Sequence, residues 1–319
     1  MINHKYEYAH QLCFMIHDVM VDFLKTGEEN DIFNSEIKLS DTEKQELLKY
    51  NGNILNWLKQ NNKNDEYKIV IKKTIIQALL SDMLHCIYEA LKAMEKGKVS
   101  VAYMLIRKPI QESLYLFEEI ILLKSEFIHI FENNPLKFRH KNGGDVQGHT
   151  KRIKQILDSL HLNQVLDASY LATLRYDKKH EDSFDGVCNQ AMHLFTEHLA
   201  IKTENLNINF IFGTSESKET LYKFMYSRLP YLMYYIYIIF EKLANNISQT
   251  TSEYLLNVQH RLAALFLLTY AEIDSEYKTE QFYNLCIAFE SLLNKNFQCE
   301  LSLDKLESIA MTGNMDSSV

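Results

Sequence analysis

The sequence predicts an all-α protein, a multi-helix bundle, on three observations. Apolar residues recur at intervals of three and four along most of the chain. Only 9 glycines and 3 prolines occur in 319 residues, which is too few for the many tight turns of a sandwich or a propeller. Hydrophobic residues make up 46% and charged residues 24%, the usual balance of a folded globular chain. We therefore expect long helices, some of them kinked, around a large core.

The N-terminal part begins with a clear helix signal. An apolar stripe over residues 6–25 predicts the first helix, and Gly27 is expected to cap its C-terminus. Ser40 and Glu43 have the spacing of a capping box, in which each side chain satisfies a free backbone donor of the other. A second helix is therefore expected to begin there.

Two longer helices are expected next. The pattern over residues 65–95 predicts one bundle helix that Gly97 stops. Ser100 can cap a further helix over residues 101–131, in which Pro109 removes one backbone donor and should kink the chain.

The remainder of the chain is predicted to be helical except for one segment. Helices are predicted over residues 150–160, 164–176, 184–198, 216–246 with a Pro230 kink, 252–273, 279–293 and 302–311. Apolar residues alternate over 205–213, which predicts one short strand or hairpin. A glycine-rich stretch divides the chain into an N-terminal helical part (1–140), a helical segment with the candidate site (141–213) and a C-terminal helical part (214–319), which can also form one domain.

Charge and cysteine content limit the protein class. The net charge of −8 argues against coating nucleic acid by bulk electrostatics, although basic residues gather over 137–154. The five cysteines are scattered without a Cys-x-x-Cys pair, which favours a reducing, cytoplasmic setting. The most apolar run, 229–240, is shorter than the roughly 20 residues of a membrane span, so we expect no membrane contact.

Arg175 and His180 form the first candidate for chemistry. Cleavage of RNA through its ribose hydroxyl needs a base and a cation beside the phosphate, and these two side chains supply both. Five residues turn a helix by about 140°, so the pair meets one phosphate only if the helix ends between them or a second chain completes the site. Lys178 and Lys179 would add binding charge. The alternative is a solvated helix end whose cations interact with the helix dipole.

Arg107 and Glu112 form the second candidate, in the otherwise apolar helix that contains Pro109. Charges in a core must find partners, because stranded ones cost several kcal/mol. Arg107 could bind a phosphate or a carbonyl freed by the kink. An ion-pair network that only organises the bundle is the alternative.

Asn189, His193 and Glu197 follow one another at intervals of four, which would place them on one helix face as a polar network. The alternative is a core histidine bonded to a carbonyl or carboxylate.

Two Glu-x-x-His pairs, Glu7 with His10 and Glu126 with His129, match those of di-metal helical bundles. Nothing in the sequence indicates that the helices with these two pairs place them opposite each other, so we predict no metal site. No glycine-rich phosphate loop is present either, so no cofactor is expected.

With these residues, the chain resembles the HEPN superfamily, all-helical proteins of prokaryotic toxin–antitoxin, abortive-infection and phage-defence systems. The resemblance rests on Arg175 to His180, which is similar to that family's Arg-x4–6-His signature. Arg107-Lys-Pro109 with Glu112 is similar to an Arg-Pro…Glu helix of related bacterial families, in which a later histidine follows as in 188–193.

The resemblance implies a metal-independent endoribonuclease that works as a homodimer with a shared cleft and leaves a cyclic phosphate. Arg175 would hold the scissile phosphate and His180 would act as acid or base, with Asn189 and His193 as supporting or alternative residues. Arg107, Glu112, Lys178 and Lys179 would bind the RNA, and an antitoxin or defence protein would be the partner. The alternative is a non-enzymatic helical protein that binds a partner, RNA or a nucleotide.

Overall fold

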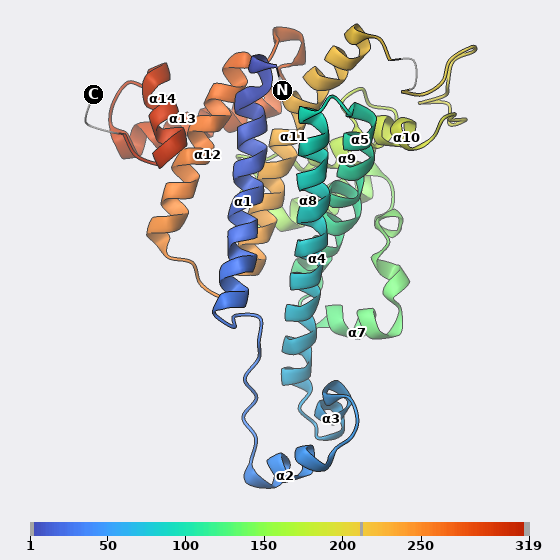
Figure 1. Cartoon of the computed structure of the whole chain (residues 1–319), viewed down its shortest axis with the longest axis vertical. Coiled ribbons are helices and arrows are strands. Elements are labelled where there is room, and N and C mark those ends of the chain that lie inside the picture. The colour runs from blue at the N-terminus through green and yellow to red at the C-terminus, as the bar shows by residue number, and fades with distance from the viewer. Residues whose placement is uncertain (1–2, 211–212, 316–319) are drawn as a thin grey trace.

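Long helices form the centre of the molecule, which a computed structural model describes over residues 3–210 and 213–315. α1 (Glu7–Glu29) packs against α4 (Asn64–Glu95), α11 (Ser215–Ala244) and α12 (Ser252–Glu272), as Figure 1 shows. The described residues form helices and connecting turns and contain no β-strand. The predicted all-α, multi-helix fold is therefore confirmed.

The buried faces of these helices follow the apolar spacing of the sequence. Leu12, Ile16 and Met20 of α1 lie four residues apart and are fully buried. α11 differs, because every residue over 224–237 is buried and the helix is therefore covered on all sides there. That stretch lies in the protein core, and the helix continues through Pro230. In the described part of the chain, every helix is too short or too polar to cross a bilayer.

The N-terminal region shows one prediction confirmed and one wrong. Ser40 and Glu43 form the predicted capping box at the start of α2 (Asp41–Lys49). α2 and α3 (Ile54–Gln60) lie at the far end of α4 in Figure 1. Gly27, however, is buried inside α1 and does not cap it. A Cβ there would lie 2.4 Å from the Phe33 ring, so close packing explains this glycine.

The single helix predicted over 101–131 is divided into three. α5 (Val99–Lys108) passes through a π-helical turn, Pro109–Ser113, into α6 (Leu114–Leu123), and α7 (Glu126–Asn133) follows. Pro109 has no backbone N–H, so it cannot make the α-helical bond to the carbonyl four residues earlier. In the π-helical turn the Leu114 N–H bonds to the Pro109 carbonyl, five residues back, rather than to the Ile110 carbonyl, four residues back. α6 ends before Lys124, whose φ of 49° is not helical.

The remaining helices form two groups. α8 (Val146–Leu160) packs on α9 (Ala168–Tyr176), and α10 (Phe184–Met192) packs on both α5 and α9. α13 (Glu280–Phe297) and α14 (Leu303–Thr312) pack against α12. Short 3-10 turns connect some of these elements: His4–Tyr6, Pro135–Phe138, His140–Gly143 and Ser275–Tyr277.

The strand predicted near 205–213 is not found where the structure describes this segment, at 205–210 and 213. Leu206 and Phe210 have a φ of 60°, which is incompatible with a strand. Leu206 is fully exposed, so the alternating apolar residues have no partner sheet to cover them. Ile211 and Phe212 lie outside the described residues.

One hydrophobic cluster runs through the molecule. It contains buried residues from 1–140, 141–213 and 214–319, the three parts that the sequence suggested. Their boundaries stay predictions, but the shared core holds α5, α6, α9 and α10 together around the π-helical turn.

Candidate functional site

Arg175 and His180 lie in different surroundings. α9 does end between them, at Tyr176, as the site hypothesis required. The Arg175 side chain is nevertheless fully buried, and its Nε donates to the Ile110 carbonyl at 2.6 Å. His180 is exposed in the following turn, where its Nδ1 accepts a bond from the Asp182 N–H. Arg175 therefore holds the π-helical turn and offers no donor to solvent in this conformation.

Glu118 of α6 neutralises Arg175 inside the protein. Its carboxylate accepts bonds from the Arg175 guanidinium, from Arg152 of α8 at 3.1 Å and from the Tyr235 hydroxyl at 2.9 Å. Burial alone would raise the pKa of Glu118, but the charges of Arg175 and Arg152 outweigh it and lower this pKa. We call Glu118, Arg152, Arg175 and Tyr235 the buried charge cluster. Its carboxylate stays ionised at neutral pH.

Gln111, in the π-helical turn, is the centre of a second set of bonds. Its amide donates to the Arg175 carbonyl at 2.7 Å and to Asp185 of α10 at 2.8 Å. The Asn189 amide donates to the same Asp185 carboxylate at 2.7 Å, and Lys178 lies 3.9 Å from it. The structure thus brings Arg175, Lys178 and Asn189 together. Their common partners, Gln111 and Asp185, were not among the predicted site residues.

Arg107 and Glu112 flank this turn on its exposed side. Their charged groups lie 3.6 Å apart, so the predicted pair is present although it is longer than a hydrogen bond. The Arg107 side chain is about one-fifth exposed and that of Glu112 about half, 22% and 51%. Both groups are consequently within reach of a ligand.

Buried polar atoms without a partner gather at the π-helical turn. Of the seven such side-chain atoms among the described residues, five lie here: Arg107 Nε, Gln111 Oε1, Ser113 Oγ, His149 Nδ1 and Arg152 Nη1. Leaving a buried donor or acceptor unpaired costs about 1–3 kcal/mol, so native proteins keep few of them. Five of them therefore lie in one region, where no other side chain or backbone group of the described residues pairs with them.

Two histidines that the sequence reasoning missed lie beside Tyr176. The buried His149 ring stacks on the Tyr176 ring with 3.6 Å between centroids, and the partly buried His140 ring is nearly parallel to it at 6.0 Å. Burial, with the charges of Arg152 and Arg175, lowers the pKa of His149 to about 3. Burial also lowers the pKa of His140, against the opposing effect of Glu112. Both imidazoles are neutral at pH 7.

A surface cleft opens against the π-helical turn. It has a volume of about 580 Å³, within the range of small-molecule sites. Lys108, Arg139, His140 and Lys141 line it together with one carboxylate, Glu112. We call it the π-turn cleft. Its basic rim attracts anions despite the acidic charge of the whole chain.

Glu112 is the one predicted site residue among those that line this cleft. Lys179 is exposed after α9, and its N–H bonds to Asp177. His193 is exposed because α10 ends at Met192, so the predicted helix face of Asn189, His193 and Glu197 is wrong. The His193 carbonyl instead accepts a bond from the Asn209 side chain.

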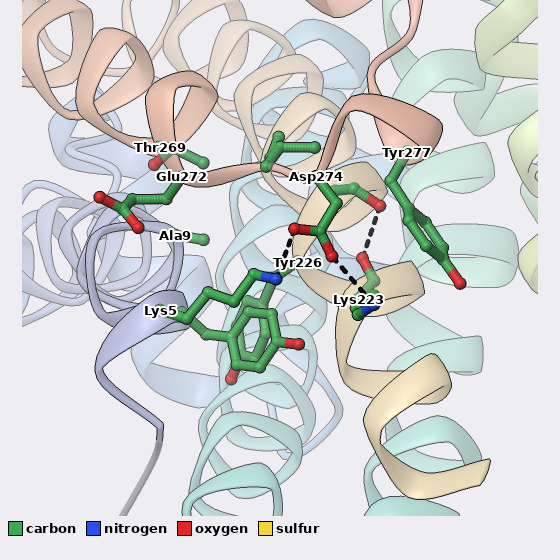
Figure 2. A pocket seen from close by; sticks show the side chains of 11 residues that line it. Lys5, Ala9, Lys223, Tyr226, Thr269, Glu272, Asp274 and Tyr277 are labelled. Atoms are coloured by element: carbon green, nitrogen blue, oxygen red, sulfur yellow. Dashed lines mark hydrogen bonds and ion pairs between the residues drawn. The ribbon is translucent and has the colours of Figure 1, made fainter. Parts of the chain in front are cut away.

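A second depression, near the N-terminus, is narrowed by ion pairs between its own residues (Figure 2), although the buried Thr269 hydroxyl in its lining has no partner. Lys5 and Lys223 of α11 both bond to Asp274, and their hydrogen bonds lower the pKa of this carboxylate. The space left is about 20 Å³, enough for one water molecule. We call it the Asp274 pocket, and its groups fasten the N-terminus to α11 and the end of α12.

The Glu-x-x-His pairs do not assemble. His10 bonds to Tyr226 and Glu95. Among the described residues, no group of three or more His, Cys, Asp or Glu side chains is placed to hold a metal ion.

The sequence carried a signal for the buried charge cluster. Glu118 and Glu119 interrupt the apolar run of α6, and a carboxylate inside such a run requires a cationic partner. Nothing local predicts His140 and His149, because only the fold brings their loop and helix to Tyr176. No known protein family, no curated protein and no solved structure matches this chain.

Proposed function

We propose that the chain binds RNA at the π-turn cleft and cleaves it as a metal-independent endoribonuclease, with His140 as general base and Arg107 as the phosphate-binding cation. The observation that carries this proposal is a cleft that is rimmed by Lys108, Arg139 and Lys141 and lined by Glu112, whose carboxylate lies 3.6 Å from the Arg107 guanidinium. A guanidinium is the side chain best suited to hold a phosphate, because its donors match two phosphate oxygens.

His140 is suited to remove a proton because its imidazole is neutral. It accepts the proton of a ribose 2′-hydroxyl, whose oxygen attacks the adjacent phosphorus. The bond from phosphorus to the 5′-oxygen breaks, and the leaving oxygen takes a proton from water. The products are a 2′,3′-cyclic phosphate and a 5′-hydroxyl. Arg107 stabilises the charge that develops on the phosphate oxygens.

In this proposal Arg175 is a positioning residue. Its Nε bond to Ile110 and its carbonyl bond to Gln111 fix the turn on which Arg107 and Glu112 depend. All groups of the cleft come from one chain, so cleavage does not require the dimer that the resemblance implies. The dimer, the antitoxin or defence partner and the toxin role stay predictions.

The test is cleavage of a labelled single-stranded RNA by the purified chain. We expect His140→Ala to lower the rate by about 10²–10⁴ and to leave RNA binding intact, and a 2′-deoxy substrate to resist cleavage. His180→Ala, at the exposed histidine outside the cleft, is the matched control and should cleave normally.

Three other results decide between the alternatives. Loss of cleavage in His180→Ala alone would support the assignment that the HEPN resemblance implies. Binding without cleavage would support the non-enzymatic RNA-binding alternative. Absence of both binding and cleavage would refute the proposed function.

A further inference from the structure

The π-turn cleft is lined by side chains of two chemical kinds. Besides the basic rim, its lining contains four apolar side chains, which we call the apolar wall: Leu79, Leu116, Pro135 and Phe138. The Phe138 ring is held in place by stacking on Phe127, with 4.8 Å between centroids. A flat apolar group fits such a wall, and a phosphate fits the rim. A nucleotide carries both groups in one molecule.

Two further lining residues, Ser113 and Glu112, add hydrogen-bonding groups to the cleft. Ser113 lines the cleft, is 2% exposed, and its hydroxyl has no partner. Glu112 precedes it in the π-helical turn, and its half-exposed carboxylate lies beyond hydrogen-bond distance of Arg107 at 3.6 Å. These two side chains can therefore bond to the edge of a ligand that lies on the apolar wall.

We propose that the apolar wall of the π-turn cleft holds one nucleobase and that Glu112 selects guanine. This inference rests on the proposed function, because the phosphate of the same nucleotide occupies the basic rim. An ionised carboxylate only accepts hydrogen bonds, with two adjacent oxygens. Guanine alone among the RNA bases presents two adjacent donors, N1–H and N2–H₂, on its Watson–Crick edge. The Ser113 hydroxyl then donates to guanine O6.

The other bases fit this arrangement less well. Adenine, cytosine and uracil each place an acceptor next to their edge donor, so one carboxylate oxygen would face a lone pair. Uncompensated burial of such groups is unfavourable. We expect guanosine monophosphate to bind about tenfold more tightly than the three other monophosphates, the effect of one two-point contact.

The experiment is calorimetric titration of the full chain with the four nucleoside monophosphates and with ribose 5-phosphate. Glu112→Gln should lose the preference for guanine, because an amide places a donor against a guanine donor. Glu46→Gln, an exposed change on the distant α2, is the matched control and should keep it. Thermal melting of both variants checks that they fold.

The outcomes separate this inference from the proposed function. Guanosine monophosphate binding no better than ribose 5-phosphate, or a preference that persists in Glu112→Gln, would overturn the guanine site while His140-dependent cleavage could still stand. A guanine preference in a chain that cleaves no RNA would support the base site and refute the nuclease.

Discussion

The Asp274 pocket and the π-turn cleft contain the same kinds of side chains but differ in how their charged groups are paired and in the space that they leave open. Each combines lysines, a carboxylate and aromatic rings. In the Asp274 pocket both lysines bond to one carboxylate and almost no space remains. In the π-turn cleft the corresponding groups line an open volume, and buried donors and acceptors beside it have no partner. The buried Thr269 hydroxyl of the Asp274 pocket also lacks a partner, so an unpaired polar atom alone does not make a site. The two regions differ in whether the charged groups pair with one another and in the space that they leave open.

The largest expected effect concerns the buried charge cluster. Glu118→Gln removes the carboxylate that neutralises Arg175 and Arg152, and leaves two guanidinium groups buried without it. We expect the free energy of unfolding to fall by about 3–5 kcal/mol, measured by urea denaturation. Glu46→Gln, on an exposed face, should change it by less than about 0.5 kcal/mol. Equal stability of the two variants would show that the buried charge cluster does not hold the fold.

The next effect concerns RNA binding at the π-turn cleft. Arg107→Gln should weaken RNA binding about tenfold and reduce the slope of the salt dependence by about one, because one phosphate contact is lost. Its stability should change little, since the carboxylate that Arg107 faces is half-exposed. Lys44→Gln, at an exposed lysine of α2, serves as the control in the same binding assay. Unchanged RNA affinity in Arg107→Gln would contradict RNA binding at the π-turn cleft.

A smaller effect follows from the pH dependence of His149. Its pKa is about 3 in the folded chain, below the ordinary value of 6.5, so the unfolded chain binds more protons as the pH falls below 6.5. Stability should therefore decrease from pH 7 to pH 5, by an amount on the order of 1 kcal/mol from this group. His149→Asn should reduce that decrease in pH-dependent melting.

The control for this prediction is His161→Asn, at the exposed C-cap of the same helix. Its left-handed backbone conformation suits asparagine, so the variant should fold normally and keep the full pH dependence. A pH dependence that is identical in His149→Asn and the unaltered chain would contradict the role given to His149.

The smallest effect belongs to the Asp274 pocket. Asp274→Asn weakens two partly exposed ion pairs, so we expect a loss of about 0.5–1 kcal/mol in unfolding free energy and no change in RNA affinity. If RNA binding instead fell as much as in Arg107→Gln, the distinction between the ion-paired Asp274 pocket and the open π-turn cleft would fail.

The sequence alone determined the helical class, the capping box at Ser40 and the interruption at Pro109. Each depends on neighbouring residues, through side-chain spacing, a local hydrogen bond or a missing backbone N–H. Where a local pattern needed a distant partner, the prediction failed. The alternation over 205–213 has no second strand to pair with where the structure describes it, and Gly27 is explained by Phe33 rather than by a cap.

Tertiary structure decided which charged and aromatic side chains meet. Arg175 and His180 are close in the chain, but burial directs Arg175 to Glu118 and leaves His180 in solvent. His140, from the connecting turns after α7, reaches the same region as Arg107 because the core packs α5, α8, α9 and α10 around the π-helical turn. The free energy that selects this arrangement comes from burying apolar surface between segments far apart in sequence. A local motif does not show which distant segments pack against it.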